Sequence, residues 1–501
     1  MSANPSFDTI ILNDEDLFAC SNQIETIIPR KMLRRIFTSL TWFDYERGKL
    51  SQTDCYDRLV AEFGRSTEDI HSAITKTRES LRLHEDLVTL LLELKQQSNG
   101  KLRVFTMTNL SVPDCQELKH QLNWSIFDRV FTSAEAGERK PHLGFYKYVI
   151  EAGTIDSRRT IFVDTEAESV LTARSLGLYG MVLSRDNITE MRRSLHNLLG
   201  NPVARANRYL ERTAGNLQSV SDTGVVLKEN FAQLLILELT GNKYLSSILL
   251  VIAFEIHVRL RNLVDIVEYP RAWNFFHGKG VLTTESYPFD FDTTAVALTV
   301  LERDKEVIKS VMDEMLEYID SDGIILTYFD RRRGQRIDPV VCVNVLNLFY
   351  KFHRESEMRP TLEWIKSVLR NRAYLDGTRY YANAECFLFF VVRLLLSTDN
   401  VALHGDLTPL LKERLQERIG IPGDAAQLAM RIIACASVGL RDDLDLSALL
   451  KFQCEDGSFE LSWTYRYPSS GIKIGNRGLT TALAIKAIES AKSLKPMIAT
   501  V

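Results

Sequence analysis

The sequence predicts a multidomain protein with an N-terminal α/β domain, built on a parallel sheet with a helical cap, and a C-terminal all-α barrel. The chain has 501 residues, which is more than one hydrophobic core usually organises. Its first part, residues 1–200, alternates short β-type runs with helical stretches, whereas residues 223–501 show almost only helical patterns. Residues 201–222 are poor in apolar residues and rich in turn formers, so we predict a linker there.

The N-terminal β-type runs are each followed by polar residues. Strands separated by helices predict a parallel sheet, and ligands of such sheets bind at the carboxyl ends of the strands. The runs are DTIIL, LRVFTMTN, RVFTSAEAG, TIFVDTE and GMVLS. The polar residues that follow them are Asn13, Asp14, Glu15, Asp16, Thr108, Asn109, Lys140 and Asp164.

This series resembles the haloacid dehalogenase-like (HAD) phosphohydrolases over about residues 6–200. In that family an Asp nucleophile ends the first strand, and an acid follows two residues later. The resemblance puts Asn13 at the nucleophile position and Glu15 at the acid position. It makes Thr108 and Lys140 the phosphate-holding residues and Asp164 the magnesium ligand. The run WFDYERGKLSQTDCYDRLVAEFG resembles the family's helical cap, expected at about residues 17–95.

The nucleophile position is the point at which this sequence departs from the HAD pattern. An amide is far too poor a nucleophile to form an acyl-phosphate, so Asn13 predicts a weakened or inactive phosphatase. A register shifted by one residue would instead provide an Asp14-x-Asp16 pair, if the strand extended through Asn13. Both registers stay open at this point.

The C-terminal part combines apolar helical patterns with recurring Asp-Gly turns. The helical patterns cover residues 230–241, 305–319, 339–353, 384–396 and 479–491. The turns lie at Asp322-Gly323, Asp376-Gly377 and Asp456-Gly457, at uneven spacing. Paired helices closed into a barrel would explain this pattern, because each pair needs a neighbour to cover its apolar side. The stretch FQCEDGSFELS resembles the repeats of terpene-cyclase α-barrels, with Phe459 where Trp is commoner.

The stretch SYPFDFDTTAVAL places two carboxylates, Asp290 and Asp292, before an apolar helix. Alone, such a pair is more often a helix cap. Here aromatic residues surround it, and DFDTT resembles the D-x-D-D and D-x-D-T-T signatures of class II terpene cyclases, which protonate an alkene. Together with the Asp-Gly turns and the HAD-like domain, the order resembles drimane-type sesquiterpene synthases over nearly the whole chain.

This resemblance implies a mechanism and a substrate. Asp292 would donate the proton, Asp290 would assist it, and Thr293 and Thr294 would orient the carboxyl groups. Burying two carboxyl groups together raises the proton affinity of one of them, as this chemistry requires. The implied substrate is farnesyl diphosphate, and the implied product is a bicyclic drimane-type diphosphate such as albicanyl or drimenyl diphosphate.

Other residues are candidates for holding the cation and the diphosphate. Aromatic faces stabilise cations, and the candidates are Trp273, Phe276, Tyr287, Phe289, Tyr328, Trp463 and Tyr465. The basic candidates for the diphosphate are Lys473, Arg477, Arg331, Arg333 and Arg336, and we expect Mg²⁺ to accompany the diphosphate. The nearest match to a class I D-D-x-x-D motif, RDDLDL, has the wrong spacing. The diphosphate should therefore survive cyclisation.

Net charge, cysteine spacing and hydropathy indicate which binding partners and cellular compartment to expect. A net charge of -4 argues against a general nucleic-acid binder. The seven cysteines are scattered without a C-x-x-C pair, which indicates reduced thiols in a cytoplasmic protein. The longest apolar stretch, YLSSILLVIAFEI, is shorter than the ~20 residues of a membrane span, so we expect no transmembrane segment. Two other hypotheses stay open: a bifunctional cyclase-phosphatase that releases a drimane alcohol, and a noncatalytic scaffold. In the leading one, separate phosphatases would act on the product.

Overall fold

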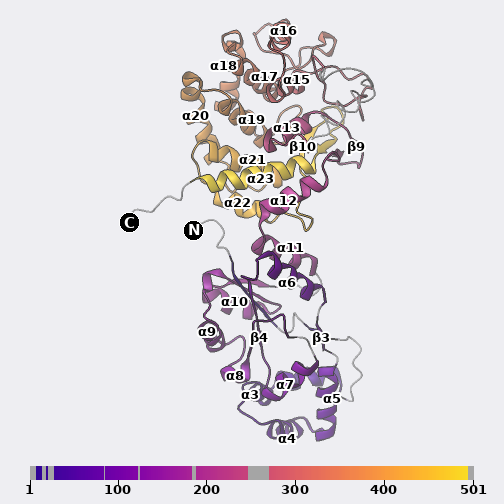
Figure 1. The fold of residues 1–501 in the computed structure, drawn as a ribbon, viewed down its shortest axis with the longest axis vertical. Coiled ribbons are helices and arrows are strands. Elements are labelled where there is room, and N and C mark those ends of the chain that lie inside the picture. The colour runs from indigo at the N-terminus through magenta and orange to yellow at the C-terminus, as the bar shows by residue number, and fades with distance from the viewer. Residues whose placement is uncertain are drawn as a thin grey trace. The chain divides into compact units, whose positions relative to one another are not determined.

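The protein folds as two compact units, residues 1–200 and 201–501, in a computed structural model (Figure 1). The structure describes residues 7–13, 18–20, 28–79, 81–83, 85–121, 124–182, 188–245 and 270–494. No helix among these residues is long and apolar enough to cross a membrane. Most of the apolar stretch 244–256 lies outside them.

A five-stranded parallel sheet in the order β5-β4-β1-β6-β7 organises the first unit. Its strands are β1 (Thr9–Asn13), β4 (Arg103–Thr108), β5 (Arg129–Thr132), β6 (Thr160–Asp164) and β7 (Tyr179–Val182). Side chains of a strand alternate between the two faces. Thus Ile10 and Leu12 pack with α6 (Glu85–Gln97) and α11 (Ile188–Leu199), while Ile11 packs with α9 (Leu143–Ala152) and α10 (Ala167–Ser175). The predicted strands, and the parallel sheet covered by helices on both faces, are confirmed.

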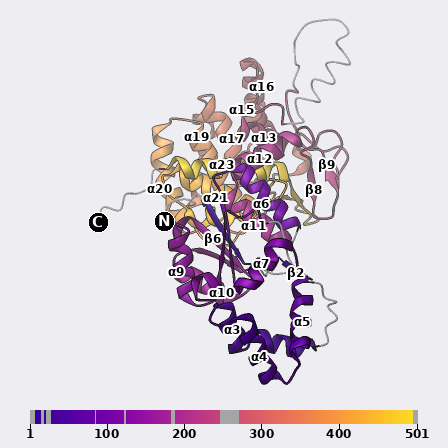
Figure 2. The ribbon, with the colours of Figure 1, turned by 60° about the horizontal axis from the view of Figure 1, so that its bottom comes forward.

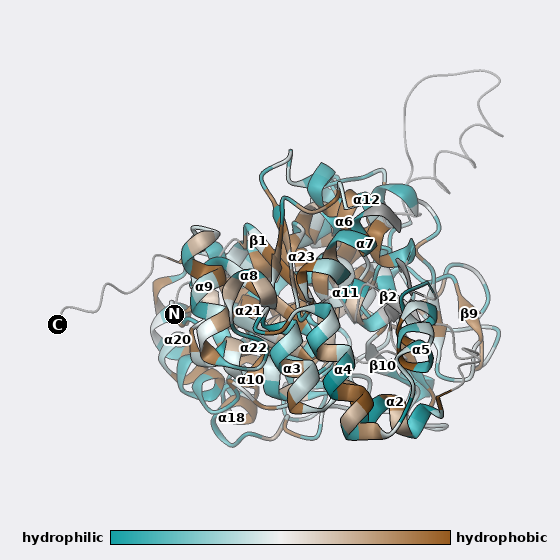
Figure 3. Ribbon diagram, turned by 90° about the horizontal axis from the view of Figure 1, so that it is seen from below, coloured by the Kyte–Doolittle hydropathy of each residue, from teal (hydrophilic) through white to brown (hydrophobic). Residues whose placement is uncertain are grey.

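The helical cap lies at one end of the first unit and has its own hydrophobic cluster (Figure 2). It consists of α2 (Arg30–Phe37), α3 (Leu40–Glu46), α4 (Gln52–Phe63) and α5 (Thr67–Glu79), between the paired strands β2 (Phe18–Cys20) and β3 (Leu81–Leu83). Helix α4 carries both hydrophilic and hydrophobic residues (Figure 3), and its buried residues Cys55, Tyr56 and Leu59 recur at helical spacing, as expected of an amphipathic helix. The cap is shorter than predicted, because α6 packs its leucines on the sheet rather than in the cap. The remaining helices described in this unit are α7 (Val112–Gln121), α8 (Ser133–Ala136) and the 3₁₀ turn Ser157–Arg159.

An α-barrel forms the second unit, as the sequence predicted. Its inner helices are α13 (Phe231–Thr240), α15 (Phe291–Val300), α17 (Pro339–Lys351), α19 (Ala384–Leu396), α21 (Ala425–Ser437) and α23 (Arg477–Ser493). Each packs against the next, and α23 packs against α13, so the ring closes. The flanking helices are α12 (Pro202–Arg212), α16 (Lys305–Leu316), α18 (Arg359–Arg370), α20 (Val401–Gln416), α22 (Asp443–Leu450) and the 3₁₀ turns Arg331–Arg333 and Glu355–Met358.

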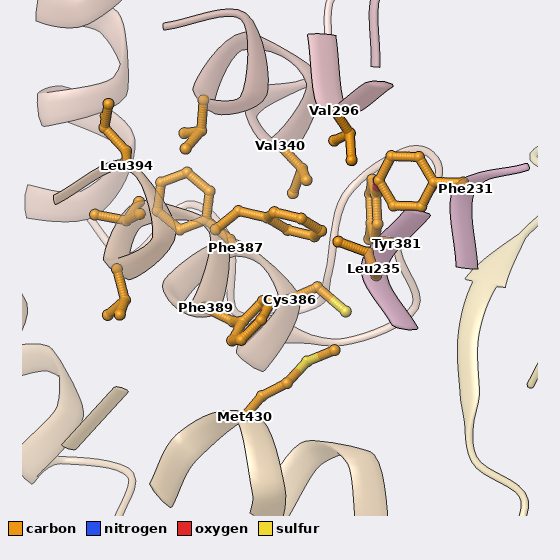
Figure 4. Packing of buried hydrophobic residues seen from close by; sticks show 14 of the residues in the cluster. Phe231, Leu235, Val296, Val340, Tyr381, Cys386, Phe387, Phe389, Leu394 and Met430 are labelled. Atoms are coloured by element: carbon orange, nitrogen blue, oxygen red, sulfur yellow. The ribbon is translucent and has the colours of Figure 1, made fainter. Parts of the chain in front are cut away.

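The inner helices meet in one large hydrophobic core (Figure 4). Helices α17 and α19 are apolar around almost their whole circumference, which is typical of helices buried on every side. One fully buried cation of this unit is paired twice: Arg431 lies 2.8 Å from Glu385 and 2.8 Å from Asp445. Pairing is what makes such burial tolerable.

Residues 201–222, predicted as a linker, belong to the folded second unit. Ala206 and Leu210 on α12 and Leu217 beyond it are buried in the barrel core. This part of the chain was misjudged because α12 buries only one side and is polar on the other.

A four-stranded antiparallel sheet in the second unit was also not predicted. It has the order β10-β11-β8-β9. Its strands are β8 (Ser219–Ser221), β9 (Val226–Leu227), β10 (Trp463–Arg466) and β11 (Lys473–Gly475). Strands this short carry too few residues for a period-two pattern.

The Asp-Gly turns share a left-handed backbone. Gly323, Gly377 and Gly457 have φ of 81°, 76° and 91°. A Cβ at Gly377 would stand 2.4 Å from the carbonyl oxygen of Tyr381, and one at Gly457 would stand 2.4 Å from that of Arg205. Glycine is therefore required at both turns, on grounds of φ and of space.

Candidate active site

A cavity of about 290 Å³ lies at the N-terminal ends of the inner helices of the barrel. Its volume is near the lower end of the range for small-molecule sites, about 300–1,000 Å³. The lining residues come from the starts of α13, α15 and α17, from β10 and β11, and from the connecting loops. They are Phe231, Phe275, Thr283, Thr284, Tyr287, Asp290, Asp292, Thr293, Thr327, Tyr328, Arg333, Arg336, Val341, Arg379, Tyr380, Tyr381, Tyr465, Arg466, Tyr467, Pro468, Ser469 and Ile474.

Asp290 and Asp292 both line this cavity at the first turn of α15. Asp290 is the N-cap, and its Oδ1 accepts a 2.6 Å hydrogen bond from the backbone N–H of Thr293. Its Oδ2 is buried and has no hydrogen-bond partner among the described residues. The pair therefore serves both as the helix cap and as the candidate acid that the sequence suggested. Asp290 caps α15, and Asp292 faces the cavity.

Burial makes both carboxyl groups weak acids. It raises the pKa of Asp290 to about 7, against the lowering effect of hydrogen bonds from the backbone and side chain of Thr293. Burial raises the pKa of Asp292 to about 8, a hydrogen bond from Tyr381 lowers it, and the charge of Asp290 raises it again. At pH 7 Asp292 thus holds its proton for most of the time.

Two hydrogen-bond donors hold the carboxyl group of Asp292. Asn344 on α17 donates from Nδ2 to Oδ1 at 2.7 Å, and the Tyr381 hydroxyl donates to Oδ2 at 2.5 Å. Neither residue was predicted from the sequence. A signal for Asn344 existed, since an amide within the apolar run VVCVNVL is out of place in a buried helix unless it has a partner.

Thr294 does not orient the carboxyl groups, contrary to the prediction. Its hydroxyl donates to the carbonyl oxygen of Trp273 at 3.1 Å and accepts from the N–H of Trp273 at 2.9 Å. It therefore holds the segment before α15 rather than the acids. Thr293 does contact Asp290, as stated above.

The aromatic candidates are only partly in the cavity. Tyr287, Tyr328 and Tyr465 line it, and the sequence analysis missed Phe231, Tyr380 and Tyr381. Four predicted rings lie elsewhere, because neighbouring positions of a loop or strand point in different directions. Trp273 and Phe276 are buried outside the lining, Phe289 is 50% exposed, and Trp463 is half-buried on β10 away from the cavity.

Four arginines line the cavity: Arg333 and Arg336, which were predicted, and Arg379 and Arg466, which were missed. Among the described residues, none of these four guanidinium groups forms a salt bridge. No carboxylate among the described residues therefore lies within ion-pair distance of them.

The other basic candidates do not line the cavity. Arg331 donates to the carbonyl oxygen of Glu317 at 2.5 Å, and its guanidinium lies over the ring of Tyr318. Lys473 and Arg477 are exposed. Lys473 alternates with Ile474, whose side chain faces the cavity, so the pleat of β11 turns the lysine away.

The HAD-like positions of the first unit gather at the carboxyl edge of its sheet. Thr108, Asn13 and Asp164 end the adjacent strands β4, β1 and β6. Lys140 Nζ lies 3.4 Å from Asp164 Oδ2, and both side chains are buried. Glu15, with Asp14 and Asp16, lies outside the described residues. The magnesium role of Asp164 stays a prediction, and the described residues contain no cluster of three or more possible metal ligands.

Comparisons with known proteins identify relatives of both units. A family model described as the sesquiterpene cyclase astC-like C-terminal domain matches residues 203–352. Drimenol cyclase drtB of Aspergillus calidoustus is 40% identical over 473 residues, which cover 94% of this chain and 86% of that protein. The sesquiterpene phosphatase astK of Aspergillus oryzae is 35% identical over 185 residues, which cover 37% of this chain and 92% of that protein.

Solved structures similar to the chain fall into two groups. The type II terpene cyclase MstE from Scytonema aligns with 59% of this chain and 99% of its own, at 14% identity and a TM-score of 0.43. A HAD family enzyme from Bacteroides thetaiotaomicron aligns with 36% of this chain and 95% of its own, at 18% identity and a TM-score of 0.31.

Proposed function

Since the chain belongs to the family of drimane-type sesquiterpene cyclases, whose members join a HAD-like domain to a class II terpene cyclase domain, we propose that Asp292 protonates the distal alkene of farnesyl diphosphate. The chain then closes to a bicyclic drimane-type diphosphate, albicanyl or drimenyl diphosphate. Membership of this family makes the protein a class II terpene cyclase, so the scaffold hypothesis is dropped.

The observation that carries the proposal is the state of Asp292. Its pKa of about 8 keeps a proton available at neutral pH in a cavity whose lining includes several aromatic rings. A raised pKa also makes a weaker acid, and an alkene is a very weak base. The donors Asn344 and Tyr381 offset this, because they stabilise the carboxylate that forms as the proton leaves.

The cation that follows needs stabilisation without a nucleophile. Tyr381 packs against the rings of Phe231 and Tyr465, with centroids 6.2 and 5.7 Å apart. The faces of such rings attract a cation by roughly 0.5–2 kcal/mol each. Ring surface also offers no nucleophile that would quench the cation.

The arginines of the cavity suit the other end of the substrate. Arg333, Arg336, Arg379 and Arg466 can each donate several hydrogen bonds to diphosphate oxygens. The described residues around the cavity do not fit a protein-held Mg²⁺, because they include no cluster of three or more acidic, histidine or cysteine ligands. We therefore assign any Mg²⁺ to the substrate diphosphate and route no step through it.

The proposed product keeps its diphosphate, because Asn13 replaces the nucleophile of the HAD pattern. The names of two relatives favour a second candidate. Drimenol cyclase drtB is named for an alcohol, and astK is named a phosphatase. In this candidate the first unit also removes the diphosphate, using a residue among Asp14, Glu15 and Asp16.

One incubation separates the two candidates. The purified protein is given farnesyl diphosphate, and the products are extracted with and without added phosphatase before mass spectrometry. The first candidate predicts drimane alcohol only after phosphatase treatment. Drimane alcohol without it supports the bifunctional enzyme, and farnesol alone after treatment would overturn both.

A further inference from the structure

Behind the proton donor, on the side away from the cavity, lies a buried arginine that connects four inner helices. Arg393 on α19 donates from Nη2 to Thr299 Oγ1 on α15 at 2.6 Å and from Nη1 to Asn344 Oδ1 on α17 at 3.2 Å. Its Nε lies 2.7 Å from Glu238 Oε2 on α13. None of these four residues lines the cavity.

We propose that the ion pair between Arg393 and Glu238 positions and tunes the proton donor Asp292 through the amide of Asn344. The proposal deepens the proposed function and rests on it, because it concerns the proton transfer from Asp292. Arg393 and Glu238 are positioning residues, since neither touches the substrate.

The hydrogen bonds of Asn344 fix the orientation of its side-chain amide. A guanidinium group only donates hydrogen bonds, so the Asn344 oxygen must face Arg393. The Asn344 nitrogen must then face Asp292, where it donates to Oδ1. With the amide flipped, its oxygen would accept the acidic proton of Asp292 and hold it away from the cavity. Arg393 therefore keeps the proton of Asp292 free for the alkene.

The charge of Arg393 must also be neutralised for Asp292 to stay protonated. A buried cation near Asp292 would favour the ionised carboxylate, which cannot protonate an alkene. Glu238 neutralises Arg393, with its carboxylate oxygens 2.7 and 2.9 Å from Nε. A second cation, Lys351, donates to the carbonyl oxygen of Thr299 at 2.5 Å. Because Thr299 also binds Arg393, two positive charges lie close together here, and the negative charge of Glu238 offsets them.

Other charged and titratable groups also surround Asp292, and Arg333, Arg336, Arg379, Arg466 and Tyr465 line the same cavity. Asp290 precedes Asp292 on the same element, and the buried Asp338, the N-cap of α17, adds negative charge. Tyr381 and Asn344 donate to it, and the thiol of Cys342 on α17 is also close. Among the described residues outside the cavity lining, Arg393 and Lys351 are two cations near Asp292, and Glu238 forms an ion pair with Arg393.

The test variant is Glu238→Gln, which keeps the size of the side chain and an oxygen for Arg393 but removes the charge. Two charges roughly 10 Å apart at an effective dielectric of about 20 shift a pKa by about one unit. The alkaline limb of the kcat–pH profile should therefore move about one unit lower. Turnover at pH 8 should fall about fivefold, while turnover at pH 6 stays the same.

Two further variants separate charge and geometry from a purely structural effect. Arg393→Lys keeps the positive charge but loses the planar guanidinium group that orients the Asn344 amide. The value of kcat should therefore fall about tenfold or more at every pH, while the alkaline limb of the kcat–pH profile stays at the same pH. Glu417→Gln is the matched control: Glu417 binds Arg372 through both oxygens at 2.5 and 2.8 Å, and is 37% exposed against 33% for Glu238. It should leave the profile unchanged.

An activity-free measurement keeps the inference separate from the proposed function. The infrared carbonyl band of the protonated Asp292, identified by its loss in Asp292→Asn, is titrated without substrate. A midpoint about one unit lower in Glu238→Gln supports the proposal. If the midpoint and the pH limb of Glu238→Gln stay in place or move higher, the proposal is overturned. If the midpoint moves lower as expected but the unaltered protein does not turn over farnesyl diphosphate, only the proposed function is overturned.

Discussion

Replacing Tyr381 by Phe removes one atom from the proton donor's surroundings and leaves the ring in place. The hydroxyl donates to Asp292 Oδ2 at 2.5 Å, while the ring packs against Phe231, Phe390 and Tyr465. The variant therefore tests the hydrogen bond rather than the packing.

The expected magnitude follows from the charge on the acceptor. A hydrogen bond to a charged group contributes about 1.5–3 kcal/mol, so its loss raises the pKa of Asp292 by about one to two units. The same loss destabilises the carboxylate that forms in the transition state, and kcat should fall roughly 10- to 100-fold. A higher pKa adds almost no compensating gain at pH 7, because a group with a pKa of about 8 is already about 90% protonated there.

The assay is the steady-state conversion of farnesyl diphosphate between pH 5 and pH 10. Activity needs the protonated acid, so it is lost as the pH rises through the pKa of Asp292, and in Tyr381→Phe this limb should lie higher. Tyr465→Phe is the comparison, because the Tyr465 hydroxyl is buried in the same cavity with no hydrogen-bond partner among the described residues. In that variant the limb should stay in place. An unchanged kcat, or a limb that moves lower, in Tyr381→Phe would refute the reasoning.

Three other outcomes are expected. Asp292→Asn should lose cyclisation yet melt several degrees higher than the unaltered protein at pH 8 by calorimetry, and a less stable variant would contradict this. Burial raises the pKa of Asp292 from 3.8 to about 8, so the folded form keeps a proton that the unfolded form releases. The unaltered protein therefore loses stability as the pH rises from about 4 to 8, by roughly 4 kcal/mol at pH 7. Arg379→Ala and Arg466→Ala should each raise KM for farnesyl diphosphate about tenfold at low salt, and an unchanged KM would remove them from the diphosphate site. Asp164→Asn should leave the amount of cyclised diphosphate unchanged, and the loss of an alcohol product in this variant would favour the bifunctional enzyme.

The fold could be predicted where one local pattern decides the outcome. The run at Ile10–Leu12 is apolar, short and followed by polar residues, and it became the central strand β1. The apolar run of α19 is long enough to indicate a buried helix. Helix α6 was assigned to the cap because sequence order does not say which surface its leucines cover, and the contacts with Ile10 and Val104 decide this.

Around the proton donor, the sequence predicted only those site residues that are close neighbours along the chain. Asp290 and Asp292 are neighbours in sequence, and their motif is readable. Asn344 lies 52 residues from Asp292 and Tyr381 lies 89 residues from it, so only the closed ring of helices brings these donors to the acid. Trp273 was a plausible ring beside the motif, but its side chain is buried outside the cavity.

The central claim is that Asp292 delivers the proton that starts cyclisation, and the most direct measurement is the reaction in D₂O. The exchangeable proton of Asp292 is then deuterium, so the account predicts a bicyclic product that carries one deuterium at the carbon of the former distal alkene, and no cyclised product from Asp292→Asn. A cyclised product without deuterium, or cyclisation by Asp292→Asn at the rate of the unaltered protein, would contradict it.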